Sequence, residues 1–184
     1  MTLYQALAIL IIIIIVVLAI FIYRQIMWSK IDKPYVNGEF KEALRRIKLY
    51  SKWLPLSHQK QIVYTTSIAI LTDDDELFLE NIDKINRKSH TYGPYYFYYN
   101  IAYYMNHNDF VRAEKLYGDL TTKYNVSKDL DLVTPLAILM ANKGDNKAYK
   151  KLKDLKRNNH IDITFLAVAT RYIRRTKRDG REDI

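Results

Sequence analysis

The apolar and polar positions divide the chain into one long apolar run and a following amphipathic part. No charged residue occurs before Arg24, and residues 3–23 are almost entirely apolar. A helix of about 20 apolar residues rises roughly 30 Å, which matches the hydrocarbon thickness of a bilayer. We therefore expect residues 1–28 to form an N-terminal transmembrane anchor. Residues 29–37, which contain Pro34, are expected to be a short linker.

Two other interpretations of the apolar run fit the sequence less well. A cleavable signal peptide needs a positively charged start and a small-residue cleavage site. Residues 1–5 carry no Lys or Arg, and residues 21–24 offer no such site. A buried helix of a soluble protein would carry polar residues on one face, but none interrupts the run from Ala6 to Ile22. The sequence therefore favours a retained membrane anchor.

The charges beside the anchor predict its orientation. Lys and Arg concentrate on the cytoplasmic side of a membrane helix, within about 15–20 residues of its ends. None precedes the apolar run, whereas Arg24, Lys30, Lys33 and Lys41 follow it. We expect a single-pass protein of the cell membrane, with its N-terminus outside and its C-terminal domain in the cytoplasm. The absence of cysteine agrees with a reducing compartment.

Beyond residue 37, apolar residues recur at intervals of three and four, which is typical of amphipathic helices. This spacing, with the Gly, Pro and Asp residues between the segments, predicts eight further helices. They cover residues 39–53, 57–71, 77–87, 95–107, 110–124, 130–142, 147–157 and 162–176. No segment alternates like a strand, so the expected fold class is all-α. Residues 38–176 are expected to form one helical domain, and residues 177–184 a polar tail.

Several residues predict where these helices begin and end. Pro55 is expected to end the first helix of the domain, and residues 127–129 to cap the sixth. Segment 72–76, which contains four acidic residues, is interpreted as the start of the third helix, because carboxylates are favoured at the positive end of the helix dipole, and not as a metal site. Pro135 is tolerated only in a first turn, which suggests that its helix begins later than residue 130.

The predicted helices form pairs, and Ala or a substitute for it recurs at the start of the second helix of each pair. These positions are Ala43, Asn81, Ala113 and Ala148, at intervals of 38, 32 and 35 residues. The best-preserved unit contains Phe97, Asn100, Ile101, Tyr104, Phe110, Ala113 and Tyr117. This pattern resembles the tetratricopeptide repeat, whose period is about 34 residues. The resemblance implies a right-handed α-solenoid of antiparallel helix pairs, closed by a C-terminal capping helix. A generic array of helical hairpins is the alternative.

A tyrosine-rich helix follows Gly93 and carries more aromatic residues than one packing face needs. One of its stripes consists of Tyr95, Tyr98, Ala102 and Met105. The resemblance to tetratricopeptide repeats implies that this stripe lines the concave wall, where that family holds peptides or helices. Tyr suits such a surface because it combines a large area with a polar tip. The alternative is that these tyrosines belong to the core.

The net charge of +9 comes from 29 Lys and Arg against 20 Asp and Glu, and it lies outside the apolar run. A basic face is predicted at Lys147, Lys150, Lys151, Lys153, Arg174 and Arg175. A solvated surface explains such a face without any ligand. Of the functional explanations, contact with anionic lipid is favoured over nucleic acid, because the anchor already holds the domain beside the inner leaflet.

Residues with catalytic or metal-binding chemistry are sparse in the sequence. It has no Cys and no Gly-rich phosphate loop, and its four His residues lack a metal-ligand spacing. We expect no enzyme activity, no metal and no cofactor. The expected function is that of a membrane-anchored scaffold that recruits a protein or peptide partner, a component of a membrane complex. The alternative is a membrane-tethered basic domain that binds anionic lipid or nucleic acid.

Overall fold

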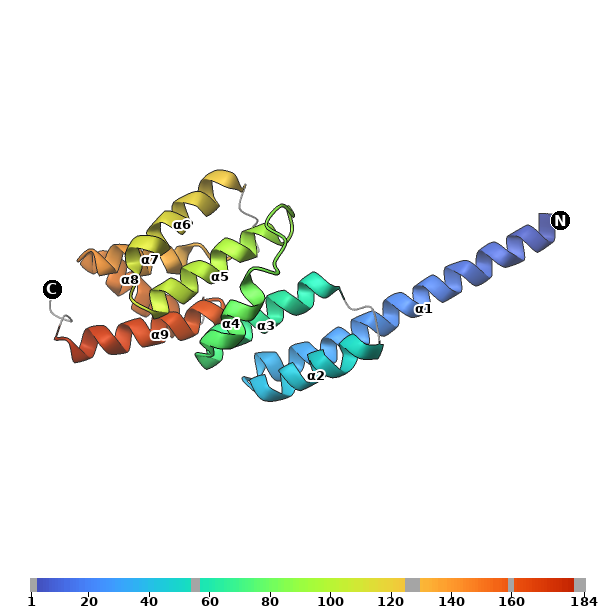
Figure 1. The fold of residues 1–184 in the computed structure, drawn as a ribbon, viewed down its shortest axis with the longest axis horizontal. Helices are drawn as coiled ribbons and strands as arrows, with labels where there is room; N and C mark the ends of the chain where they lie inside the picture. Colours follow the sequence, from blue (N-terminus) through green and yellow to red (C-terminus); the bar gives the residue numbers. More distant parts are fainter. Residues whose placement is uncertain (1–2, 54–56, 125–129, 159–160, 181–184) are drawn as a thin grey trace. The chain divides into compact units, whose positions relative to one another are not determined.

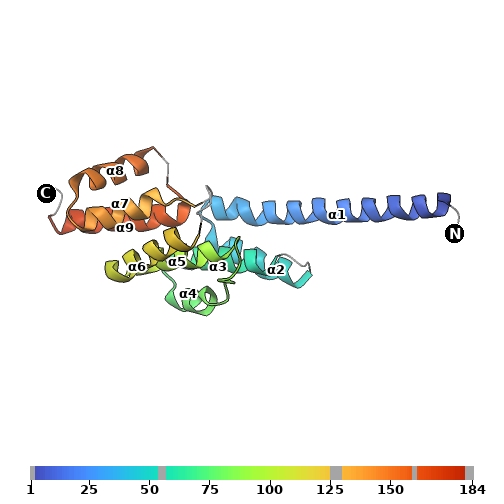
Figure 2. The same cartoon turned by 90° about the horizontal axis from the view of Figure 1, so that it is seen from above.

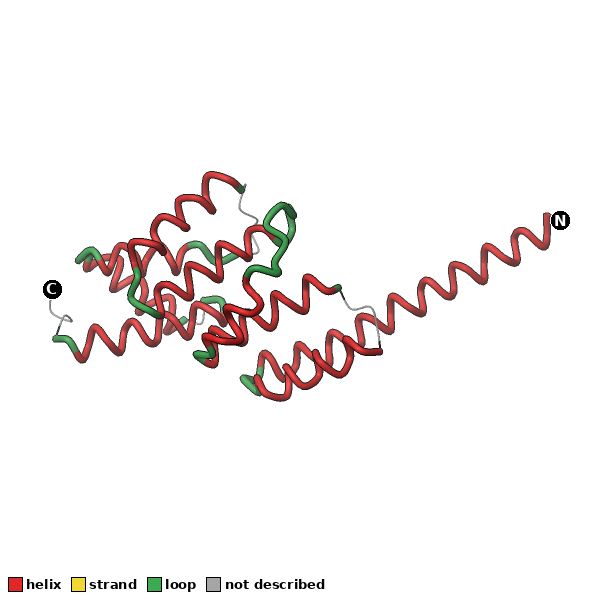
Figure 3. The backbone as a smooth tube through the Cα atoms, in the orientation of Figure 1, coloured by secondary structure: helices red, strands yellow, loops and turns green. Residues whose placement is uncertain are grey.

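The computed structural model describes residues 3–53, 57–124, 130–158 and 161–180, and its regular structure is entirely α-helical (Figure 3). The helices labelled in Figure 1 are α1 (Leu3–Val36), α2 (Phe40–Trp53), α3 (His58–Thr72), α4 (Asp75–Ile82), α5 (Gly93–Asn106), α6 (Phe110–Lys123), α7 (Val133–Asn142), α8 (Asn146–Arg157) and α9 (Ile163–Arg178). The all-α prediction is confirmed. The features predicted at residues 55, 127–129 and 181–184 lie outside the described residues.

The described chain divides into two compact units, Met1–His58 and Gln59–Ile184. In the first unit, α1 continues as far as Val36, so most of the linker predicted over residues 29–37 is helical. Pro34 lies in the last turn of α1, where it cannot donate a hydrogen bond to the carbonyl of Lys30. Nη1 of Arg46 donates to that carbonyl oxygen instead, at 2.6 Å. The helix therefore accommodates Pro34 because a side chain replaces the missing backbone donor.

Helix α2 pairs with the C-terminal part of α1, as Figures 1 and 2 show. The turn between them contains Gly38 at a φ of +79°, a conformation that Gly adopts without steric cost. Side-chain hydrogen bonds from Arg45 and Arg46 lower the pKa of Glu42 to about 2. Because α2 packs on α1, it belongs to the first unit. From the sequence it was expected in the helical domain of residues 38–176.

The second unit contains helical hairpins. Helix α5 packs most extensively on α6, and α7 on α8, as the pairing in the sequence predicts. Contacts of α4 with α5 and of α6 with α7 connect successive pairs. Several helices begin at an Asp whose side chain accepts hydrogen bonds from the first-turn backbone; these residues are Asp74, Asp109, Asp145 and Asp162. The predicted capping role of the acidic segment 72–76 is confirmed by the bond from Leu77 N to Asp74, at 2.9 Å.

Helix α9 holds several helices of the second unit together. It packs on α5, α7 and α8, and Figure 2 shows it beside α7. The hydroxyls of Thr164 and Ser67 lie 2.8 Å apart, which links α9 to α3 as well. A terminal cap of a solenoid would contact only the neighbouring repeat. The last helix therefore makes more distant contacts than the cap that the sequence analysis expected.

Candidate functional site

The tyrosine stripe predicted to bind a partner lies mostly in the core of the second unit. Tyr98, Ala102 and Met105 are 2%, 0% and 3% exposed, and Tyr95 is partly buried. The ring of Phe165 on α9 lies 4.8 Å from the ring of Tyr98. These three buried residues therefore belong to the core, which was the alternative interpretation of the stripe, because α9 covers this side of α5. In this arrangement a partner would not reach three of the four side chains.

The pKa of the Tyr98 hydroxyl also reflects its burial. Burial raises the pKa of Tyr98 well above its usual value, and the carboxylates of Asp162 and Asp131 act in the same direction. The phenol therefore stays protonated at physiological pH and is poorly suited to act as a base.

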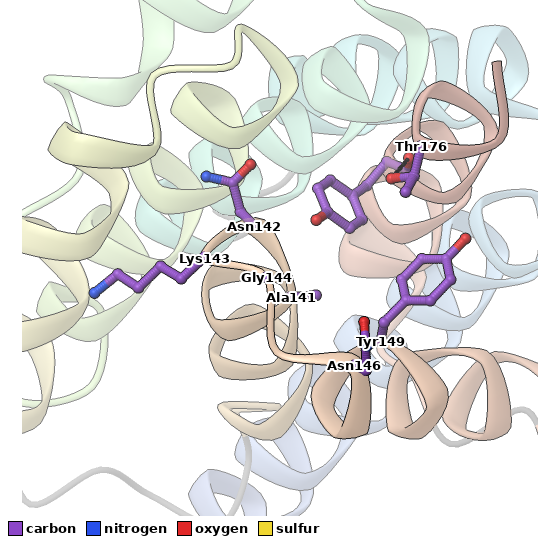
Figure 4. Close-up of a pocket in the computed structure, with 8 residues that line it drawn as sticks. Ala141, Asn142, Lys143, Gly144, Asn146, Tyr149 and Thr176 are labelled. Atoms are coloured by element: carbon purple, nitrogen blue, oxygen red, sulfur yellow. Dashed lines mark hydrogen bonds between the residues drawn. The ribbon is translucent and has the colours of Figure 1, made fainter. Parts of the chain in front are cut away.

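A pocket of about 320 Å³ lies between the α7–α8 turn and α9 (Figure 4). Its described lining consists of Ala141, Asn142, Lys143, Gly144, Asn146, Tyr149, Tyr172 and Thr176. The side chain of Lys143 points away from the pocket and pairs with Glu114 on α6. The remaining polar groups are amides and hydroxyls, which can form hydrogen bonds but supply no general base near neutral pH.

His107 forms a link between two helices. Its Nε2 lies 3.0 Å from Oδ2 of Asp75 at the start of α4, and its Nδ1 lies 2.9 Å from the carbonyl oxygen of Tyr103. Burial lowers the pKa of His107, but the hydrogen bonds to Tyr103 and Asp75 and the nearby negative charges outweigh it, so the net pKa is raised. In the described part of the chain, no three His, Cys, Asp or Glu residues are grouped to hold a metal ion.

The predicted basic face is divided by the fold. The lysines at positions 147, 150, 151 and 153 and Arg174 are exposed, whereas Arg175 is partly buried and donates to Oδ1 of Asn108 at 2.7 Å. Lys147 and Lys151 lie beside α7. Lys153 lies 4.4 Å from the ring of Tyr149 and near α9. These cations therefore belong to two surfaces and not to one continuous face.

The structure also contains an apolar groove that the sequence analysis missed. We call it the α7–α8 groove; its described lining is Val133, Leu136, Ala137, Met140, Asp145, Lys147, Ala148 and Lys151, and its volume is about 250 Å³. Val133, Leu136 and Met140 are 46%, 44% and 40% exposed. One feature of the sequence indicates this groove: residues 133–142 include no charged side chain on any face of the helix. A helix that is apolar all round leaves an apolar face exposed unless it is fully enclosed.

The other large apolar surface belongs to α1. Its segment Leu7–Val36 is long and apolar enough to span a membrane, and none of the most apolar window is buried. Side chains such as Ile12, Val17 and Phe21 are exposed. A core helix of a soluble protein would be covered by other helices.

Two surfaces of the described residues thus stand apart from the cores: the apolar length of α1 and the α7–α8 groove with its lysines. Both surfaces combine aliphatic side chains with cations. Comparisons of the chain with protein-family models, curated proteins and solved structures find no match.

Proposed function

We propose that this protein is anchored in the cell membrane by α1 and recruits a partner protein to that membrane through its cytoplasmic helical domain. The observation that carries the proposal is the exposed apolar surface of α1, which has the length of a bilayer crossing. The cytoplasmic location of the domain is supported by the cations at positions 24, 30, 33 and 41, which follow the apolar run.

We further propose that the helical domain is a tetratricopeptide-like array whose concave wall is occupied by its own last helix. The repeat interpretation is supported by the helix pairs α5–α6 and α7–α8 of the second unit, and by Ala113, which is fully buried at the start of α6. The occupied wall is supported by the contact of Tyr98 with Phe165. A partner would then bind outside that wall, and the α7–α8 groove is the exposed apolar surface at which it does so.

Recruitment accounts for the groove better than catalysis does. Apolar side chains that remain exposed together, bordered by polar residues, mark contact sites on soluble surfaces. The groove lining contains one carboxylate, Asp145, and its side chain accepts hydrogen bonds from the backbone of Lys147 and Ala148. That carboxylate caps α8 and is already engaged within the fold.

The test of this function is purification of the full-length chain from its own membranes in mild detergent, followed by mass spectrometry of the proteins that remain bound. The control carries the same α1 fused to an unrelated soluble domain. We expect a defined protein to be enriched with the full chain and absent from the control. Equal recovery in both samples would contradict recruitment by the helical domain.

The orientation has its own test, because the chain has no cysteine. Leu79 is 60% exposed on α4, so a Leu79→Cys chain offers one accessible thiol. A membrane-impermeant maleimide should label it only after the cells are permeabilised. Labelling of intact cells would place the domain outside.

A second candidate function is direct contact with anionic lipid. It is favoured by Lys150 and Arg174, which are exposed and form no ion pair with the described carboxylates. Each such cation near an anionic leaflet contributes about 1 kcal/mol of attraction. Reversing both charges should weaken association of the domain with phosphatidylglycerol in nanodiscs. Unchanged association would contradict this function.

A further inference from the structure

We propose that the α7–α8 groove binds an amphipathic α-helix of the partner protein, with apolar side chains in the groove and Asp or Glu facing Lys147 and Lys151. This inference rests on the proposed recruitment function and specifies the chemistry of the partner.

The apolar wall of the groove has the spacing of a helix-binding surface. Val133, Leu136 and Met140 lie three and four residues apart on one face of α7 and are each about half exposed. Seven residues of helix rise about 10 Å, which is close to two turns. A partner helix with apolar anchors at i, i+3 or i+4, and i+7 covers the same length.

The floor of the groove is made of small side chains. Ala137 of α7 is 5% exposed, and Ala148 of α8 is partly buried. Because these methyl groups fill little space, a hollow of about 250 Å³ remains between the two helices. A ridge of side chains on another helix can enter such a hollow, as ridges enter grooves between packed helices. A planar membrane surface would touch the rim without filling the floor, so a helix fits better than lipid.

The rim of the groove carries positive charge without an internal partner. Lys147 and Lys151 lie one turn apart on α8, and no described carboxylate forms an ion pair with either. Like charges at i and i+4 destabilise a helix by mutual repulsion. The neighbouring Lys143 and Arg157, by contrast, pair with Glu114 and Asp154. Carboxylates on a partner helix would relieve the repulsion and set its orientation in the groove.

The backbone of the site also favours a helical partner over an extended one. The groove is formed by two helices, α7 and α8. Their internal N–H and C=O groups are already paired within the helices, so there is no sheet edge that an extended peptide could join. Affinity must therefore come from side chains, which is how helix-in-groove recognition works.

The experiment uses the full-length chain in phosphatidylcholine nanodiscs and a displayed library of random 16-residue peptides as the probe. We expect enriched peptides to carry apolar residues at helical spacing and Asp or Glu beside them. The best peptide, labelled for fluorescence anisotropy, should lose about tenfold in affinity with Leu136→Asp and with the pair Lys147→Glu and Lys151→Glu, which corresponds to about 1.4 kcal/mol.

Two control variants test whether the loss of peptide affinity is specific to the groove. Leu79→Asp places the same change at an exposed leucine of α4, and Lys150→Glu reverses a lysine of α8 outside the groove lining. Both should leave peptide affinity within about twofold, a difference of less than half a kcal/mol. Because all these positions are exposed, the urea midpoints of the variants should match that of the unaltered chain, which verifies that the fold is intact.

Several outcomes would overturn the inference. These are the absence of enriched peptides, enrichment of peptides without acidic residues, and affinity that is indifferent to Leu136→Asp. A membrane role would appear as a blue shift of a solvatochromic dye at Met140→Cys when phosphatidylglycerol is added to the nanodiscs, without any response to peptide. If the library yields no peptide but co-purification recovers a partner, the helix-binding groove is wrong and the recruitment function stands. If both experiments fail, both proposals are wrong.

Discussion

Tyr98 illustrates how the surroundings of a side chain, more than its chemical type, decide its role. Tyrosine suits both a binding surface and a core, because its ring is apolar and its hydroxyl is polar. Tyr98 is enclosed by α9, whereas Tyr95 of the same stripe remains partly exposed. The helical pattern places the two residues on one side of α5 but does not reveal that another helix covers it.

Replacing Tyr98 should therefore affect stability. Tyr98→Ala removes a buried aromatic ring that contacts Phe165, and we expect the free energy of unfolding to fall by about 3–5 kcal/mol. Tyr95→Ala, at the partly exposed end of the stripe, should cost less, about 1 kcal/mol. Urea denaturation followed by circular dichroism measures both. Equal losses would contradict the burial of Tyr98.

His107 predicts a pH dependence of stability. Its pKa in the folded chain is raised above the unfolded value of about 6.5, so its contribution is fully present below that pH. The contribution is lost as pH rises through the folded-state pKa, because the neutral ring no longer pairs with the carboxylate of Asp75. His107→Ala should thus lower the urea midpoint more at pH 5.5 than at pH 9. The control Asp75→Asn should flatten this dependence, and an equal loss at both pH values would refute it.

At the scale of the elements, α9 connects segments that are distant in the sequence. Arg171 of α9 donates to the carbonyl oxygens of Ile70 and Leu71 at 3.2 and 3.3 Å, and it lies 3.3 Å from a carboxylate oxygen of Asp73. The carbonyls in the last turn of a helix lack partners within the helix. A cation at that end is also favoured by the helix dipole. Arg171 therefore caps α3 from another helix.

This cap yields a matched pair of substitutions. Arg171→Ala should lower the free energy of unfolding by about 1–2 kcal/mol, because two charge-assisted hydrogen bonds are lost while water replaces part of them. Arg174→Ala, three residues further along α9 at an exposed position, should change it by less than about 0.5 kcal/mol. Urea midpoints of the two variants give the comparison. A similar loss of unfolding free energy in both variants would contradict the capping role of Arg171.

At the scale of the whole molecule, the proposed membrane anchor is the feature with the largest consequence. The apolar segment of α1 exposes its side chains, and water would be an unfavourable environment for so much aliphatic surface. The regular structure of the two units is otherwise α-helical in their described residues. An anchored chain would therefore present helical surfaces beside the bilayer.

Two charges in the apolar segment should abolish its insertion. Each Lys at the centre of a membrane helix costs about 2.5–3.5 kcal/mol, so Ile13→Lys with Ile14→Lys should release the chain from membranes washed with alkaline carbonate. Leu49→Lys with Leu79→Lys, at exposed positions outside the segment, is the control and should leave the chain in the membrane pellet. A double-lysine α1 that still pellets would disprove the anchor.

Much of the helical structure could be predicted from the sequence, because the signals are local. The bounds of α2, α5, α6 and α8 fall within two residues of those expected from three-and-four spacing and from Asp and Gly residues. Pro135 correctly indicated a late start of α7. The linker was mispredicted because Arg46, which compensates for Pro34, lies on another helix.

The sequence by itself determined the apolar length of α1, the all-helical fold class and the pairing of α5 with α6 and α7 with α8. These features depend on hydrophobic spacing, capping side chains and short turns, which act over a few residues. Only the tertiary structure decided that Tyr98 is covered by Phe165, that the predicted basic residues divide between two surfaces, and that α7 keeps an exposed apolar face. The reason is that burial depends on which distant helix packs on a given face, and Tyr98 and Phe165 lie on α5 and α9, which are separated in the chain by α6, α7 and α8.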